Sequence, residues 1–139
     1  MTDQPELTVV TVTYSPGSHL ERFLSSLTVA TDRPVHVIMA DNGSVDGAPE
    51  EATERYPGTR LLRTGANLGY GSAVNRAVAT IPADQEFVLV VNPDVVWGPG
   101  SIDVLLEAAK RWPTAAALGP LVRDPDGSVY PSARHLPGL

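Results

Sequence analysis

The chain has 139 residues, of which 42% are hydrophobic and 19% are charged, and its formal net charge is −6. This composition is typical of one soluble globular domain and not of a disordered chain. An acidic surface repels phosphate, which argues against a general nucleic-acid binder. The chain has no cysteine, which excludes disulfides, zinc thiolates and thiol catalysis.

The beginning of the chain is expected to be a strand, a helix and a second strand. Residues 7–13 are rich in β-branched side chains, which is typical of a strand. A helix is predicted to begin at Ser18, because Glu21 three residues later completes a capping-box pattern. Residues 35–40 read as the second strand, which ends in the turn sequence Asp41-Asn-Gly-Ser44.

The same alternation continues through the middle of the chain. A polar helix over residues 49–56 and a strand over residues 60–63 precede a helix that ends near Thr80. Residues 87–91 are apolar at every position. We therefore predict a strand that is buried on both faces, as at the centre of a parallel sheet.

The last third predicts a helix from Ser101, a fifth strand over residues 115–118 and a turn over residues 124–127. Repeated strand–helix alternation is typical of parallel strands with right-handed helical crossovers. We therefore predict an α/β fold with an open, mainly parallel, Rossmann-like sheet flanked by helices, as one domain over residues 1–139. The longest strongly apolar run is far below the ~20 residues of a membrane span. We expect a cytoplasmic protein whose only membrane contact would be peripheral, at the inner face of the plasma membrane.

Polar clusters follow the predicted strands. They are residues 13–15, residues 41–44, residues 67–69 and residues 92–94. Ligands of open parallel sheets bind outside the carboxyl ends of the strands, so these clusters are expected to form one site.

Two aspartates in these clusters have both a functional and a structural interpretation. Asp41 could accept hydrogen bonds from a nucleobase or a ribose, or it could simply cap a tight turn. Asp94 could hold a divalent cation, since Mg²⁺ takes one or two carboxylates together with phosphate oxygens and waters. Alternatively, Asp94 only starts a turn before residues 97–100.

The start of the third helix offers an anion site, because helix N-termini present free N–H groups. Asn67 and Gly69 flank this start, and Asn75 lies further in, where it could instead satisfy a neighbouring loop. Residues 69–74, Gly-Tyr-Gly-Ser-Ala-Val, approach the dinucleotide fingerprint. However, Val74 replaces the last small residue, and the preceding strand is the third and not the first.

These motifs together resemble the inverting glycosyltransferases of the GT-A fold, family 2. The resemblance is carried by Val-Thr-Val-Thr-Tyr14, Ala-Asp-Asn-Gly-Ser-Val-Asp-Gly47, Asn-Leu-Gly-Tyr-Gly71 and Val-Asn-Pro-Asp94. The tail over residues 119–134 is similar to the rhamnosyltransferase branch. The resemblance implies transfer of L-rhamnose from dTDP-L-rhamnose, or of a sugar from a UDP-sugar, to polyprenyl-diphosphate-linked N-acetylglucosamine in cell-wall synthesis.

The resemblance also implies roles for matched residues. Asp41 would contact the base, and Asp94 would bind Mg²⁺ or Mn²⁺. Asn92 stands where many relatives carry an aspartate, which leaves a single carboxylate for the metal and implies either weak metal affinity or partial metal dependence. The implied nucleotide-sugar site consists of Thr13, Tyr14, Asp41, Asn67, Gly69, Asn75 and Asn92.

Members of this family place their general base in a later, acceptor-binding half. The resemblance therefore implies no catalytic residue within this chain and a base beyond Leu139. We expect the 139-residue chain, as a truncated donor half, to bind nucleotide sugar without transferring it. A non-catalytic nucleotide-binding or assembly module of the same shape is the alternative. Apolar residues near Leu118 and Leu121 leave homo-oligomer formation open.

Overall fold

The computed structural model describes residues 7–132. The chain separates into two compact units, one that ends at Gly100 and one that begins at Ser101. The elements of the first unit are β1 (Leu7–Thr13), α1 (Ser18–Ala30), β2 (Val35–Asp41), α2 (Ala48–Arg55), β3 (Thr59–Arg63), α3 (Tyr70–Val78) and β4 (Val88–Val90). The helix of the second unit is α4 (Ser101–Arg111).

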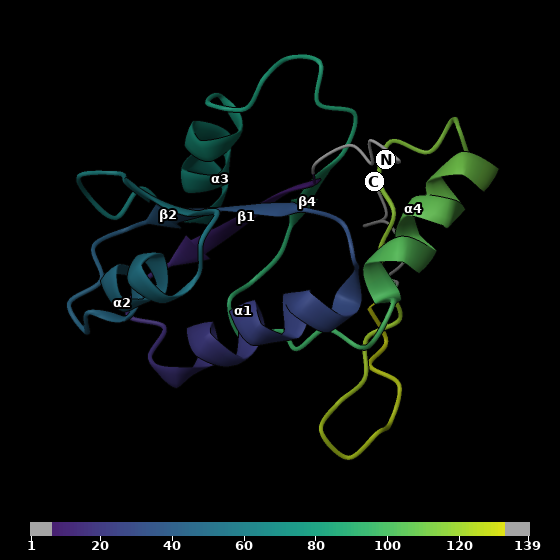
Figure 1. Cartoon of the computed structure of the whole chain (residues 1–139), viewed down its shortest axis with the longest axis horizontal. Helices are drawn as coiled ribbons and strands as arrows, with labels where there is room; N and C mark the ends of the chain where they lie inside the picture. The colour runs from purple at the N-terminus through teal and green to yellow at the C-terminus, as the bar shows by residue number, and fades with distance from the viewer. Residues whose placement is uncertain (1–6, 133–139) are drawn as a thin grey trace, which may run out of the picture. The chain divides into compact units, whose positions relative to one another are not determined.

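The four strands form one parallel sheet in the order β3-β2-β1-β4. Helices α1 and α2 lie on one face of this sheet and α3 lies on the other (Figure 1). The first two connections lead outward from β1, whereas α3 returns the chain past β2 and β1 to β4. The strand order therefore reverses between β1 and β4. The α/β prediction with a mainly parallel sheet is confirmed.

Strand β1 is the buried centre of the sheet. Its alternating side chains supply both faces: Val10 packs with Ile38 and with Ala73 and Ala77 of α3, while Val9 lies on the opposite face. The face that carries α1 is covered by apolar residues at helical spacing: Leu20, Phe23, Leu24 and Leu27. The β-branched run at the start of the sequence thus forms the most deeply buried strand of the sheet.

The prediction for residues 87–91 is wrong in its position. Only Val88–Val90 form β4, which pairs with β1 alone among the described residues. Val90 is 45% exposed, so this strand is an edge strand and not a central one. A short apolar run signals burial of some kind, but it does not specify which neighbours supply that burial.

The predicted capping box at the start of α1 is also absent. Gly17 is the N-cap residue, Ser18 is already helical, and no side chain caps the helix. Glu21 faces α2 instead, where it accepts a hydrogen bond from the Tyr56 hydroxyl at 2.6 Å and lies 3.1 Å from Arg55. A polar contact at the surface between α1 and the end of α2 therefore takes the side chain that local capping would have used.

The second unit contains α4 and a turn. The predicted turn at residues 124–127 is confirmed, because the Gly127 N–H donates to the Asp124 carbonyl at 2.8 Å. A single antiparallel bridge joins Arg123 and Val129 across this turn. The predicted fifth strand at residues 115–118 is wrong, since these residues form no strand. No helix within residues 7–132 is long and apolar enough to cross a membrane.

Candidate functional site

The polar clusters lie together at the edge of the sheet where the carboxyl ends of the strands are. The strands are parallel, so the segments that follow β1, β2, β3 and β4 all leave from the same edge. Thr13 lies opposite Asp41 in the register of β1 and β2, and Val10 lies opposite Val90 in that of β1 and β4. Ligands of open α/β sheets bind at this edge, where the strand order reverses. In this sheet the reversal lies between Tyr14 after β1 and Asp94 after β4.

Asp41 is the most buried charged group of this edge, with 2% of its surface exposed. Its carboxylate accepts hydrogen bonds from the Thr13 hydroxyl at 2.8 Å and the Ser44 hydroxyl at 2.5 Å. It also accepts from the backbone N–H groups of Gly43 and Ser44 at 3.2–3.3 Å. A carboxylate offers about four acceptor positions, so donors of the chain itself occupy most of them. Asp41 therefore caps the turn at residues 41–44 in this structure, as its structural interpretation predicts.

These contacts determine the ionisation of Asp41. Burial is the largest single influence and would raise the pKa of the carboxyl group. The hydrogen bonds from Ser44 and Thr13, with those from the backbone at Gly43 and Ser44, outweigh it and lower the pKa below its ordinary value. Asp41 is thus an ionised carboxylate at neutral pH, held by dipoles of the protein.

The lowered pKa predicts a specific pH dependence. Because the folded-state pKa is below the unfolded value of about 3.9, the stabilisation from Asp41 is complete above that value and is lost as the pH falls through the folded pKa. The difference in unfolding free energy between the wild type and Asp41→Asn should be constant at neutral pH and shrink below about pH 4. Urea unfolding at several pH values measures this difference. A difference that stays constant down to pH 2.5 would contradict the assignment.

The loops after β1 and β2 are bound to each other. The Ser15 N–H donates to the Ser44 hydroxyl at 2.8 Å, and the Val45 N–H donates to the Ser15 hydroxyl at 3.1 Å. Ser15 adopts a φ of 50°, which is uncommon for a residue other than glycine. The adjacent Tyr14 is 63% exposed, so its ring is available at the rim of the site.

The start of α3 has a backbone that requires glycine. Gly69 is the N-cap residue with φ 78° and ψ 171°, a combination that residues with a Cβ rarely adopt. Its N–H donates to the Asn67 side-chain oxygen at 3.0 Å. Asn75 is exposed in the second turn of α3. The sequence expectation that Asn67 and Gly69 flank this helix start is confirmed.

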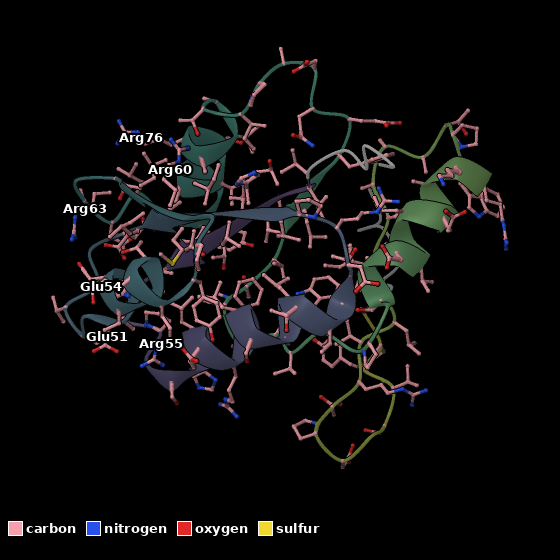
Figure 2. The ribbon with its side chains drawn as sticks, viewed as in Figure 1. Glu51, Glu54, Arg55, Arg60, Arg63 and Arg76 are labelled. Atoms are coloured by element: carbon pink, nitrogen blue, oxygen red, sulfur yellow. The ribbon has the colours of Figure 1, made fainter. Side chains whose placement is uncertain are left out.

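Arginines border the loops after β2 and β3 (Figure 2). Arg63 pairs with Glu50, and its guanidinium lies 3.9 Å from the Asp41 carboxylate. Arg76 donates a hydrogen bond to the Thr64 carbonyl oxygen at 2.6 Å. These two side chains stabilise the carboxyl edge from its outer side.

Asn92 and Asp94 are exposed after β4. Burial, and then the negative charge of Asp94, raise the pKa of Tyr70, the first residue of α3. Asp94 therefore lies within electrostatic reach of the start of α3. Asn42 donates a hydrogen bond to the Gly69 carbonyl at 3.2 Å, which connects the Asp41 turn with the start of α3.

The donor groups at this edge suit a divalent cation that is coordinated partly by the protein and partly by a bound ligand. Within residues 7–132, no three His, Cys, Asp or Glu side chains are grouped so that they could bind a metal by themselves. Asp94 supplies one exposed carboxylate and Asn92 one amide. This donor set suits Mg²⁺ or a similar hard cation only if phosphate oxygens and waters complete the coordination.

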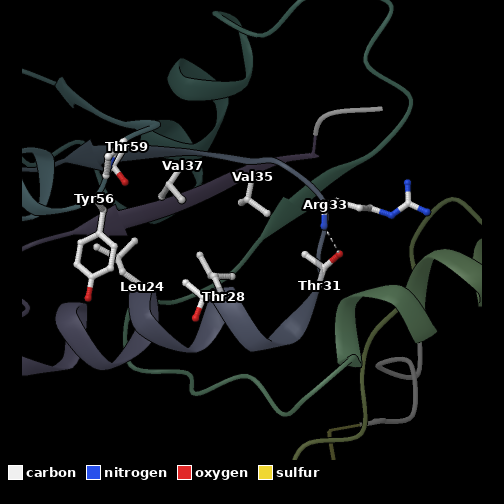
Figure 3. Close-up of a pocket in the computed structure, with 10 residues that line it drawn as sticks. Leu24, Thr28, Thr31, Arg33, Val35, Val37, Tyr56 and Thr59 are labelled. Carbon is white, nitrogen blue, oxygen red and sulfur yellow. Dashed lines mark hydrogen bonds between the residues drawn. The ribbon is translucent and has the colours of Figure 1, made fainter. Parts of the chain in front are cut away.

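A separate cavity of roughly 190 Å³ opens at the other edge of the sheet (Figure 3). It lies between α1 and the strands, and its walls include Leu24, Tyr56, Val35 and Thr59. Val35 and Thr59 are the first residues of β2 and β3. The cavity is therefore at the amino ends of these strands and contains none of the sequence-predicted site residues.

Three of the residues that hold this edge together lie inside the predicted polar clusters but received no individual role from the sequence, and a fourth, Thr64, lies outside those clusters. Ser15, Asn42, Ser44 and Thr64 form the hydrogen bonds that hold the loops, but each occurs in a segment that also reads as an ordinary turn. The signal that could have identified them is their position directly after strands that the alternation already predicted. Their partners lie 22 to 30 residues away in sequence.

Comparisons with known proteins agree with this architecture. The family model described as glycosyl transferase family 2 matches residues 8–137. The chain is 65% identical over 142 residues to an N-acetylglucosaminyl-diphospho-decaprenol L-rhamnosyltransferase of Mycobacterium tuberculosis (strain CDC 1551 / Oshkosh). That alignment covers 96% of this chain and 46% of the relative, so the chain spans about half the length of the curated relative.

Solved structures share the fold. The mannosyltransferase PcManGT from Pyrobaculum calidifontis, in complex with GDP-Man and Mn²⁺, matches with a TM-score of 0.67 and 24% identity, covering 90% of this chain and 37% of that one. S. aureus TarS 1–349 in complex with UDP-GlcNAc matches with a TM-score of 0.59 and 25% identity, covering 76% and 30%. With a family model that matches almost its whole length, this chain belongs to glycosyl transferase family 2.

Proposed function

We propose that the chain is the donor-binding part of an inverting glycosyltransferase that transfers L-rhamnose from dTDP-L-rhamnose to a polyprenyl-diphosphate-linked N-acetylglucosamine. The sugar and the acceptor are proposed from the 65% identity with the mycobacterial rhamnosyltransferase. The observation that carries the donor site is the position of Tyr14, Asp41 and Asp94 at one edge of a parallel sheet. The site residues of this proposal are Thr13, Tyr14, Asp41, Asn67, Gly69, Asn75, Asn92 and Asp94.

The proposed site has a base end and a phosphate end. Tyr14 and the turn at residues 41–44 form the base end, where the exposed aromatic ring offers a stacking surface. Asp41 orients this turn through its bonds to Thr13 and Ser44. Asp94 and Asn92 form the phosphate end beside the start of α3. A divalent cation held there with the diphosphate would neutralise charge on the leaving group.

The chemistry assigned to the complete enzyme is a direct displacement at the anomeric carbon. The acceptor hydroxyl loses its proton to a general base and attacks, while the nucleoside diphosphate departs from the opposite side, so the configuration inverts. The base is proposed to lie outside residues 7–132, in the acceptor-binding part. Because the proposed acceptor is linked to a lipid, we propose that the reaction takes place at the cytoplasmic face of the plasma membrane.

Titration of the 139-residue chain with nucleotides tests the proposal. Isothermal calorimetry with dTDP-L-rhamnose, dTDP and UDP should show binding that Mg²⁺ or Mn²⁺ strengthens, with dTDP-L-rhamnose tighter than dTDP. NAD serves as the comparison ligand, because residues 69–74 approach a dinucleotide fingerprint. That segment follows β3 at the sheet edge, whereas dinucleotide sites use the turn after the central first strand. Binding of NAD in preference to dTDP and UDP would reject the glycosyltransferase proposal.

A further inference from the structure

The side chain of Asn42 connects the turn after β2 with the loop before α3. Asn42 is 5% exposed, and its backbone N–H donates to the Thr13 carbonyl oxygen at 2.9 Å. Its side-chain nitrogen donates to the Gly69 carbonyl at 3.2 Å. Its side-chain oxygen accepts from the Leu68 N–H at 3.4 Å and lies 3.1 Å from the Thr64 hydroxyl.

Both ends of this amide have a required position. The Leu68 N–H can only donate and the Gly69 carbonyl can only accept, so the amide oxygen must face Leu68 and the nitrogen must face Gly69. If the amide were flipped, its nitrogen would face the Leu68 N–H and its oxygen would face the Gly69 carbonyl, so neither hydrogen bond could form. No residue except asparagine presents an acceptor and a donor with this separation on so short a side chain. A carboxylate would place an oxygen against the Gly69 carbonyl.

The connection reaches the phosphate end of the site. Gly69 is the N-cap residue of α3. The loop after β3 that ends at Gly69 and the segment after β4 that carries Asp94 leave the parallel sheet at the same edge. The position of Gly69 thus determines where the N–H groups of α3 lie relative to Asp94. Asp41 is held independently through Thr13 and Ser44. A change in the Asn42 side chain should therefore move the start of α3 and leave the base end in place.

We propose that Asn42 is a positioning residue that sets the start of α3 for the sugar and phosphates of the donor, an inference that rests on the proposed function. Its amide contacts the loop of its own chain and not the ligand. It therefore acts on the part of the binding free energy that comes from the phosphates and the sugar. This role differs from that of Asp41, whose carboxylate stabilises the turn at the base end.

The test compares two ligands on one variant. In Asn42→Asp, the affinity for dTDP-L-rhamnose should fall about tenfold, as expected for one lost hydrogen bond, while the affinity for thymidine, which lacks the phosphates and the sugar, should stay within about twofold. In Asn42→Ala, which removes the acceptor of the Leu68 N–H, amide hydrogen exchange should become faster at Leu68 and stay unchanged at Ser44, whose N–H is held by Asp41. Gln85→Glu is the matched control, because it makes the same amide-to-acid change before β4, at the opposite edge.

Asn42→Ala provides a second variant that removes the amide without adding charge, in case the aspartate prevents folding. It should show the same selective loss for the nucleotide sugar. Equal losses for thymidine and dTDP-L-rhamnose would overturn the inference, as would unchanged exchange at Leu68 in Asn42→Ala. Failure of the wild-type chain to bind either ligand would instead count against the proposed function itself, and it would be seen before any variant is made.

Discussion

Asp94→Asn should abolish the strengthening of nucleotide-sugar binding by Mg²⁺ or Mn²⁺. Asp94 is the carboxylate proposed for the cation, and the described part of the chain offers no cluster of three metal ligands to replace it. We expect the apparent metal affinity of the nucleotide-bound chain to fall about 100-fold or more, because the loss of groups that merely support a metal ligand already costs about 10- to 100-fold. Calorimetry with dTDP-L-rhamnose at increasing Mn²⁺ measures the change.

The control for this experiment is Asp84→Asn. Asp84 is an exposed aspartate that lies before β4, whereas Asp94 lies after it. The two variants lose the same charge at opposite ends of one strand. The metal effect should therefore survive in Asp84→Asn. An equal metal response in the wild type and in Asp94→Asn would remove Asp94 from the cation site, even if nucleotide binding persists.

Asp41→Ala should produce the largest loss of stability at this edge. The substitution leaves the buried Thr13 hydroxyl and the N–H groups of Gly43 and Ser44 without their acceptor. We expect the free energy of unfolding to fall by about 2–4 kcal/mol, since the buried Thr13 hydroxyl left unsatisfied costs about 1–3 kcal/mol and the N–H groups of the exposed Gly43 and the half-buried Ser44 cost less. Nucleotide binding should weaken as well, because the turn at the base end loses its fixed shape.

Asp46→Ala is the matched control for stability. Asp46 accepts two backbone hydrogen bonds, from Gly17 at 2.7 Å and Ala48 at 3.1 Å, but it is exposed. Water can replace it, so the loss should be about 1 kcal/mol, as for a helix-capping side chain. Urea denaturation followed by circular dichroism compares the two variants. Equal destabilisation would mean that the burial of Asp41 is not what makes its hydrogen bonds valuable.

The sequence by itself determined the elements of the first unit and the edge of the sheet at which the polar clusters lie. The β-branched run at residues 7–13, the apolar face of α1 and the strand–helix alternation are local patterns, and the first unit follows them. The polar clusters came next to strand ends in the sequence, and parallel strands bring such ends to one edge. Short-range periodicity and the geometry of parallel sheets are sufficient for this much.

Only the tertiary structure decided how these residues pair. The apolar run at residues 87–91 became an edge strand because strand order depends on the return of the chain over α3 and not on local hydrophobicity. Glu21 left its predicted capping position for Tyr56, 35 residues away. Asp41 and Asn42 read alike as turn residues. The two residues differ in their hydrogen-bond partners, which lie in segments next to other strands. Burial makes an unsatisfied polar group costly, so each side chain is held in the one arrangement that satisfies it.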